Sequence, residues 1–288
     1  MTERKPNWLK IKLNLGENAR YPAVRHIVEE NNLHTICSSG RCPNIGKCWS
    51  MGTATFMILG DICTRSCKFC ATKTGKPLPP IDTEPQKVAE SIRLMQLKHC
   101  VITSVDRDDL ADKGAAHWAE TINVIRDKNP QTVIEVLIPD FDAVPELLNI
   151  VIAAKPHIIG HNLETIERIT PDVRSRASYQ KSLEVLRHIA KSDCIAKTGI
   201  MVGLGETPQE VLQTMRDARD AGVCLFTIGQ YLQPTAKHIP VAEYVTPEQF
   251  EKYKQAGIEM GFDNIESGPL VRSSYMAEQS FVHSKIKL

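Results

Sequence analysis

The sequence contains no run of about 18 or more apolar residues, so no membrane-spanning helix is expected. The stretch Met1 to Pro6 is not followed by an apolar core, which argues against a secretory signal. The formal net charge is only +1, and this gives no general reason to expect nucleic-acid binding. Internal repeats and low-complexity segments are absent as well. These absences predict a cytoplasmic globular protein that binds neither membranes nor nucleic acids.

A disulfide framework is not favoured either, although the chain contains nine cysteines. Their number is odd, and six of them gather between residues 37 and 70, which favours metal or redox chemistry. These six form two triplets, spaced C-x4-C-x5-C and C-x3-C-x2-C: Cys37, Cys42 and Cys48, then Cys63, Cys67 and Cys70. A zinc site, the alternative, usually needs a second ligand pair, and none follows downstream.

Each triplet offers three thiolates, one fewer than the four that hold a cubane iron–sulfur cluster. The fourth iron is then open to a chelating amino acid that brings an amino nitrogen and a carboxylate oxygen. S-adenosylmethionine carries both groups, and a reduced cluster can pass an electron to its sulfonium. The C–S bond then breaks and gives a 5′-deoxyadenosyl radical, which can abstract hydrogen from an unactivated C–H bond.

Short apolar runs alternate with helical patterns from residue 53 onward, which predicts right-handed βαβ units and an α/β fold with a parallel sheet. Strands are predicted over 53–60, 100–104, 132–138, 157–161, 196–203 and 225–230. Helices are predicted over 21–31, 84–97, 115–127, 143–154, 178–191 and 207–221, with a last helix capped by Thr246. Six units are fewer than the eight of a closed barrel. We therefore expect a partial (β/α)6 TIM-like barrel, with an open doubly wound sheet as the alternative.

Three parts are predicted along the chain, and they form one functional unit. Residues 1–50 are an N-terminal extension that carries the first triplet in an irregular loop, and residues 51–245 are the partial barrel. Residues 246–288 are a C-terminal helix and tail.

Sites in parallel α/β folds collect at the carboxyl ends of the strands. The second triplet follows the first predicted strand directly, so its thiols are expected at this mouth. Other polar residues that follow or face the same mouth are Ser104, Asn162, Glu164, Lys197 and Gln230.

The second triplet, with Phe69 before its last cysteine and a predicted strand before it, resembles the radical S-adenosylmethionine superfamily. The two triplets together are similar to those of the lipoyl synthase family. The similarity continues in residues 101–110, 161–165, 229–235 and 271–275, and it extends from about residue 34 to residue 276.

This resemblance implies a sulfurtransferase that inserts two sulfur atoms, at carbons 6 and 8 of an octanoyl chain carried on a lysine of a carrier protein. It implies two [4Fe-4S] clusters and S-adenosylmethionine as cosubstrate. The cluster on the second triplet cleaves S-adenosylmethionine, and the cluster on the first triplet is consumed as the sulfur donor. In the family, a serine of a C-terminal Arg-Ser-Ser-Tyr motif completes the sacrificial cluster, which selects Ser274 here, with Ser273 as the alternative. Cosubstrate contacts are expected from Ser104, Asn162, Glu164, Lys197 and Gln230.

The implied partners are an octanoylated lipoyl carrier protein or domain, of the glycine cleavage H protein or 2-oxoacid dehydrogenase E2 type, and a low-potential electron donor such as flavodoxin or ferredoxin. Two other interpretations stay open. Another two-cluster radical enzyme, acting on a peptide or nucleic acid, would share the second triplet but lack the tail motif at residues 272–275. An iron–sulfur electron carrier would usually bind each cluster through four cysteines.

Overall fold

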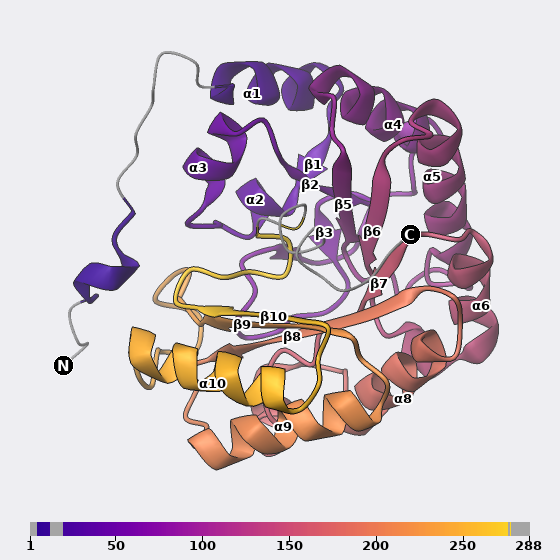
Figure 1. Cartoon of the computed structure of the whole chain (residues 1–288). Coiled ribbons are helices and arrows are strands. Elements are labelled where there is room, and N and C mark those ends of the chain that lie inside the picture. The colour runs from indigo at the N-terminus through magenta and orange to yellow at the C-terminus, as the bar shows by residue number, and fades with distance from the viewer. Residues whose placement is uncertain (1–4, 12–19, 276, 278–288) are drawn as a thin grey trace.

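The computed structural model of the chain describes residues 5–11, 20–275 and 277, and its main feature is one curved sheet with helices on its outer side (Figure 1). The predicted N-terminal extension and C-terminal tail lie partly outside the described residues. None of the described helices is long and apolar enough to cross a bilayer.

Eight strands form the main sheet in the order β1-β2-β5-β6-β7-β8-β9-β10. They are β1 (His34–Thr35), β2 (Thr55–Ile58), β5 (His99–Ser104), β6 (Val133–Leu137), β7 (Ile158–Gly160), β8 (Ile195–Val202), β9 (Leu225–Gln230) and β10 (Asn264–Gly268). Neighbours from β2 to β10 pair in parallel, and β1 runs antiparallel to β2. Because β1 and β10 are the two ends of this order, the sheet curves without closing, which confirms the predicted partial barrel.

The main helices lie where the apolar periodicity predicts them, in an arc outside the strands (Figure 1). They are α1 (Tyr21–Glu30), α4 (Glu84–Met95), α5 (Ala115–Lys128), α6 (Pro145–Ala153), α8 (Tyr179–Ala190), α9 (Pro208–Asp220) and α10 (Pro247–Glu259). Shorter pieces are η1 (Asn7–Leu9), η2 (Phe141–Ala143) and α7 (Thr170–Val173). The predicted cap of α10 is confirmed, because the Thr246 hydroxyl accepts the N–H of Gln249 at 3.3 Å.

Several short elements were not predicted from the sequence, and two differences affect the surroundings of the first triplet and the tail. The first triplet lies not in an irregular loop but partly in two short helices, α2 (Ile36–Ser39) and α3 (Ile45–Ser50). Thr35 starts α2, because its hydroxyl accepts the N–H of Ser38. Strand β10 was not predicted, since its sequence, Asn-Ile-Glu-Ser-Gly, lacks an apolar run; it forms because β9 offers a parallel edge for pairing.

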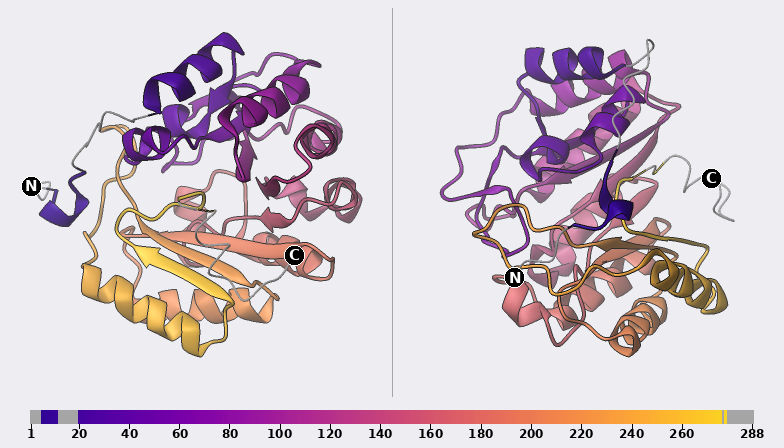
Figure 2. Two further views of the ribbon diagram at one scale, coloured as in Figure 1. Left: turned by 45° about the horizontal axis from the view of Figure 1, so that its top comes forward. Right: turned by 90° about the vertical axis from the view of Figure 1, so that its left-hand side faces the viewer.

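The apolar core fills the space between the sheet and the outer helices in two groups. One group includes Phe56 of β2 and Trp118 of α5, and the other includes Phe226 of β9 and Phe250 of α10; all four side chains are almost fully buried. Burial of this size holds the helices on the outer side of the sheet. The chain after β10 turns back over the inner side, toward the first triplet (Figure 2).

The capping box of α9 allows a stability prediction. The Thr207 hydroxyl accepts the N–H of Glu210, and the Glu210 carboxylate accepts the N–H of Thr207. Thr207→Ala should lower the free energy of unfolding by about 1 kcal/mol, because it removes the acceptor at the helix start. Urea unfolding measures the change. Thr207→Ser is the matched control and should stay close to the unchanged protein; equal losses in both variants would contradict the capping argument.

Candidate functional site

The second cysteine triplet lies in a closed loop that begins directly after β2. Gly60, with a backbone φ of 94°, helps turn the chain at the start of this loop. A two-stranded parallel sheet of β3 (Ile62–Cys63) and β4 (Lys73–Thr74) then closes the loop at its base. Cys67 and Cys70 lie between these two short strands, so one loop presents all three thiols of the triplet.

The three thiols of this triplet are partly exposed and form no disulfide bonds. Burial and the nearby charge of Asp106 raise the pKa of Cys63 to about 12, so its sulfur carries a proton until a metal displaces it. The Cys63 sulfur accepts two backbone N–H groups, from Arg65 at 3.4 Å and from Asp106 at 3.3 Å. Hydrogen bonds to the ligand sulfurs are among the features that tune iron–sulfur clusters, so this loop fits such a group.

Arg65 fixes the loop from inside. Its side chain is only 4% exposed, and its guanidinium makes two 2.8 Å hydrogen bonds to each of two carboxylates, Asp108 and Asp140. Asp108 lies in the loop after β5 and Asp140 in the loop after β6. Both contacts have the bidentate geometry for which arginine is suited. We call these three residues the Arg65 clamp; it ties the second triplet to the ends of two neighbouring strands.

The Arg65 clamp was missed by the sequence analysis. Residues 106–109 lie within the matching segment 101–110, but nothing in their spacing indicates a partner more than 40 residues earlier in the chain. A charged residue between two candidate ligand cysteines was the available signal. Because such a side chain must find counter-ions when its loop folds inward, Arg65 could have been singled out on this ground.

Three of the predicted cosubstrate residues gather at the same mouth. Ser104 is the last residue of β5, and its buried hydroxyl makes no hydrogen bond to any described residue. Asn162 and Glu164 follow β7, and burial raises the pKa of Glu164. Burial raises the pKa of Cys70 as well, with a smaller contribution from the charge of Glu164, which indicates that these two side chains are close. An unpartnered hydroxyl and a buried carboxyl group at the same end of the sheet suit a polar ligand.

The other two predicted contacts, Lys197 and Gln230, are engaged elsewhere. Lys197 donates to Glu135 at 2.6 Å in a buried ion pair. The fully buried Gln230 amide donates to three backbone carbonyls and accepts one backbone N–H. As packed here, both side chains stabilise the protein interior, and their contact with a ligand stays a prediction.

The first triplet is held against the C-terminal tail, which approaches from a distant part of the sequence. Asn44, between Cys42 and Cys48, donates its side-chain amide to the Leu270 carbonyl at 2.7 Å. Nearby, the Lys47 ammonium donates to the hydroxyl of Tyr275 at 2.8 Å. The segment 270–275 is thus fixed beside the cysteines at both of its ends.

The two adjacent serines of this tail hydrogen-bond different residues, on different sides of the tail. Ser274 accepts a hydrogen bond from the Thr55 hydroxyl at 2.8 Å. Burial raises the pKa of Cys37 in the first triplet, and the polar groups of the neighbouring Thr55 act against this rise. Ser273 instead accepts a hydrogen bond from the Asn162 amide at 2.8 Å, on the side of the predicted cosubstrate contacts. The two serines are therefore distinguished by their surroundings, which the sequence could not do.

Among the described residues, no three His, Cys, Asp or Glu side chains converge closely enough to hold one metal ion. The thiolates of a cubane site lie farther apart than those of a zinc site, because each of them binds a different iron.

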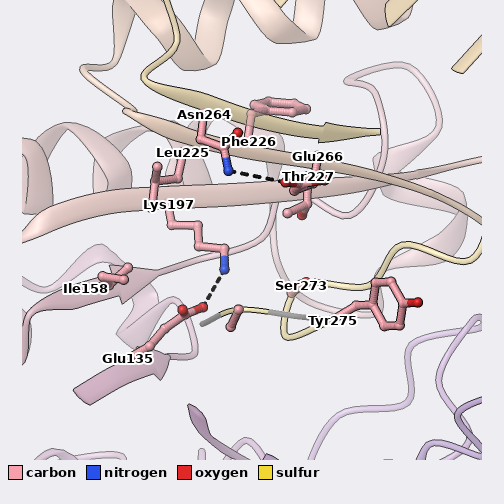
Figure 3. A pocket seen from close by; sticks show the side chains of 11 residues that line it. Glu135, Ile158, Lys197, Leu225, Phe226, Thr227, Asn264, Glu266, Ser273 and Tyr275 are labelled. Carbon is pink, nitrogen blue, oxygen red and sulfur yellow. Dashed lines mark hydrogen bonds and ion pairs between the residues drawn. The ribbon is translucent and has the colours of Figure 1, made fainter. Parts of the chain in front are cut away.

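A pocket opens on the inner side of the sheet, where the tail crosses it (Figure 3). The Lys197–Glu135 ion pair and the tail residues Ser273 and Tyr275 form part of its wall. The remaining lining residues come mainly from β9 and β10: Ile158, Leu225, Phe226, Thr227, Asn264, Glu266 and Ala277.

The loop after β9 contacts both triplets. Arg41 of the first triplet's loop donates to the Pro234 carbonyl at 3.4 Å. The His238 ring nitrogen lies 3.0 Å from the carbonyl oxygen of Cys70 in the second triplet. These contacts keep the two triplets on one connected framework.

Comparison with protein families finds the Radical SAM superfamily, matched over residues 57–218. Among curated proteins, a lipoyl synthase of Bacteroides fragilis is 63% identical over 276 residues, which cover 96% of this chain and 95% of that protein. A lipoyl synthase of Phocaeicola vulgatus is 61% identical over 284 residues, 99% of this chain and 98% of that protein.

Solved structures with a similar fold are much more distant in sequence. Methylornithine synthase superposes with a TM-score of 0.56 at 9% identity, over 85% of this chain and 75% of that chain. Coproporphyrinogen III oxidase from Escherichia coli, a radical SAM enzyme, gives a TM-score of 0.51 at 13% identity, over 76% and 56%. At such identities the likeness concerns the fold alone.

Acidification is expected to destabilise the fold through the Arg65 clamp. Hydrogen bonds from Arg65 lower the pKa of Asp108 to about 2, and, although burial opposes it, Arg65 also lowers the pKa of Asp140. In the unfolded chain both groups titrate near pH 4 (about 3.9). Their contribution to the free energy of unfolding is therefore complete above about pH 4 and is lost as the pH falls toward about 2. Urea unfolding of the cluster-free protein at a series of pH values measures this loss.

Asp140→Asn tests the assignment. This variant should make the free energy of unfolding less dependent on pH in the acid range. Because it leaves a buried guanidinium partly unpaired, it should also lower the free energy of unfolding at neutral pH by about 3 kcal/mol. Asp193→Asn, at an exposed position, is the control and should reproduce the unchanged protein. An acid dependence as steep in Asp140→Asn as in the control would contradict the role of the clamp.

Proposed function

This chain belongs to the lipoyl synthase family of the radical S-adenosylmethionine superfamily, and from that premise we propose which of its residues carry each part of the family's reaction. The chain is a sulfurtransferase: it inserts two sulfur atoms, at carbons 6 and 8, into an octanoyl chain on a lysine of a lipoyl carrier. Superfamily membership brings one [4Fe-4S] cluster and S-adenosylmethionine. The second cluster and the residue roles below are our proposals.

Cys63, Cys67 and Cys70 hold the radical-generating cluster. When bound, this cluster supplies the electron that cleaves S-adenosylmethionine and so starts radical chemistry on the octanoyl chain. Support comes from the closed loop, the free thiols and the two N–H groups that point at the Cys63 sulfur. The loop itself leaves one iron without a cysteine, since it contains no fourth one.

Ser104, Asn162 and Glu164 bind S-adenosylmethionine at the mouth. The unpartnered Ser104 hydroxyl is available as a donor to the cosubstrate, and Glu164 can accept a hydrogen bond or pair with a positive group. Gln230 supports this wall by tying backbone segments together, and Lys197 lines the adjoining pocket.

Cys37, Cys42, Cys48 and Ser274 hold an auxiliary [4Fe-4S] cluster that serves as the sulfur donor. The observation that carries this proposal is the contact of Ser274 with Thr55, which neighbours Cys37. A serine oxygen binds iron more weakly than a thiolate, so it suits a cluster that is taken apart. Ser273, turned toward Asn162, is better suited to orient that amide.

The proposed carrier is a glycine cleavage H protein or a 2-oxoacid dehydrogenase E2 component, and the proposed electron donor is a flavodoxin or ferredoxin in the cytoplasm. The three predicted parts of the chain work as one unit, because the tail completes the site that the N-terminal extension begins. The contacts of Asn44 with Leu270 and of Lys47 with Tyr275 support this arrangement.

The two serines give a matched pair of variants. After anaerobic reconstitution, the unchanged protein should hold about eight iron atoms per chain. Ser274→Ala should fall toward about four, because the auxiliary cluster loses a ligand, and should still form 5′-deoxyadenosine without a dithiolane product. Ser273→Ala should keep about eight iron atoms and raise the KM for S-adenosylmethionine, because Asn162 loses its partner. Iron analysis and mass spectrometry of an octanoylated carrier peptide measure both results, and the opposite pattern would assign the ligand to Ser273.

The triplets are separated by single cysteine changes. Cys63→Ala should abolish 5′-deoxyadenosine formation, because the radical-generating cluster loses a ligand. Cys42→Ala should keep 5′-deoxyadenosine formation and stop sulfur insertion. An intact dithiolane product from Cys42→Ala would rule out the sacrificial role, and absence of 5′-deoxyadenosine from the unchanged protein would favour an electron carrier instead.

A further inference from the structure

Two backbone N–H groups point at the sulfur of Cys63, and they come from different parts of the chain. One belongs to Arg65, in the same loop, at 3.4 Å. The other belongs to Asp106, in the loop after β5, at 3.3 Å. Nothing in either peptide group itself keeps it beside the sulfur, so the surrounding contacts must hold both in place.

The Arg65 clamp provides this restraint on both sides. The residue that donates the first N–H also carries the guanidinium, which binds Asp140 in the loop after β6 with two hydrogen bonds of 2.8 Å. The same guanidinium binds Asp108, two residues after Asp106, with two more hydrogen bonds of 2.8 Å. One side chain thus fixes the loops that contribute both donors.

Thr64 adds a second link between the same two segments. Its backbone N–H and its hydroxyl both reach the Asp106 carbonyl, at 3.1 Å and 3.0 Å. Its hydroxyl also lies 3.1 Å from the Asp108 carboxylate. The contacts of Thr64 orient the Asp106 peptide locally, but they cannot fix the pair against the rest of the barrel. Of these two neighbours, Thr64 and Arg65, it is Arg65 whose side chain also binds Asp140, in the loop after β6.

We propose that Arg65 is a positioning residue that holds the two N–H donors on the Cys63 sulfur and so raises the reduction potential of the cluster bound there. This inference rests on the proposed assignment of Cys63 as a cluster ligand. The reduced cluster carries one more negative charge than the oxidised one, and donors aimed at its ligand sulfur stabilise that added charge. The site is partly buried, where hydrogen bonds act more strongly than in water.

Charge alone would act in the opposite direction. The clamp contains one positive group and two carboxylates, Asp108 and Asp140, so its own formal charge is negative. Asp106 adds a carboxylate 3.5 Å from the Cys63 sulfur, while Lys113 and Arg176 lie within ion-pair distance of Asp108. A net negative environment makes reduction harder. Positioning of the N–H groups and simple Coulomb effects therefore predict different signs for suitable variants, which allows them to be told apart.

Arg65→Lys and Asp140→Asn are the two variants that separate these effects. Arg65→Lys keeps the positive charge and loses the fork of donors, so the positioning role predicts a lower potential, whereas charge alone predicts no change. Asp140→Asn removes a negative charge and loosens the clamp, so the positioning role again predicts a lower potential, whereas charge alone predicts a higher one. A lower potential makes the cluster harder to reduce, so a smaller fraction of it should be reduced at a limiting reductant concentration, and S-adenosylmethionine should be cleaved more slowly under that condition.

The measurement is a redox titration of the reconstituted holoenzyme, followed by electron paramagnetic resonance. The signal that changes shape when S-adenosylmethionine is added identifies the cluster with the open iron. Arg168→Lys is the matched control, because Arg168 makes a similar two-point contact with Glu210 at the exposed start of α9. Its potential should equal that of the unchanged protein.

Lower potentials in both clamp variants, with the control unchanged, would support the proposal. An unchanged potential in Arg65→Lys, or a raised one in Asp140→Asn, would overturn it, even if both variants were less stable to heat. If Arg65→Lys fails to hold the cluster, Asp140→Asn alone decides, because its two predicted shifts differ in sign. If the electron paramagnetic resonance signal of the unchanged protein does not change when S-adenosylmethionine is added, the proposed function itself is refuted.

Discussion

The open edge of the sheet is the constraint on which the first triplet and the C-terminal tail depend. The strand order ends at β1 on one side and β10 on the other, so the barrel does not close through strand pairing. The chain before β2 and the chain after β10 meet instead, through Asn44 and the Leu270 carbonyl. These two residues are separated by 226 positions, so this contact requires the whole barrel to be folded. The first triplet is therefore completed only by the finished fold, whereas the second lies in one short loop that the Arg65 clamp ties to the ends of β5 and β6.

Much of the fold could be predicted because the strands are buried runs and the helices are amphipathic. β5 and β9 are buried almost throughout, and α9 begins at a capping box, so local sequence and tertiary structure agree there. β10 could not be predicted in this way, since its polar residues become a strand only beside β9. The two short helices of the first triplet could not be predicted for a similar reason, because the residues around these cysteines lack the regular spacing of apolar side chains that indicates a helix.

The cysteines of the candidate site could be predicted from the sequence, but the polar contacts that surround them could not. Motif spacing named the thiols, and the strand ends placed Ser104 and Asn162 near them. It could not show that Arg65 binds Asp140, because the two are 75 positions apart and share no pattern. Nor could it show that the Gln230 amide already makes hydrogen bonds to backbone groups. Long-range polar contacts are chosen by the packed structure, and sequence periodicity does not record them.

The position of the tail follows from backbone packing rather than from its serines. A side chain at Gly229 would lie 2.1 Å from the carbonyl oxygen of Val271, so the tail can pass this closely over β9 only where a glycine stands. Once the backbone is fixed there, Ser273 and Ser274 occupy neighbouring places on a turn and reach different partners. Their separate assignments therefore have a physical basis in this chain. The family motif identifies the pair of serines, and their hydrogen bonds with Thr55 and Asn162 distinguish the one that lies on the side of the first triplet.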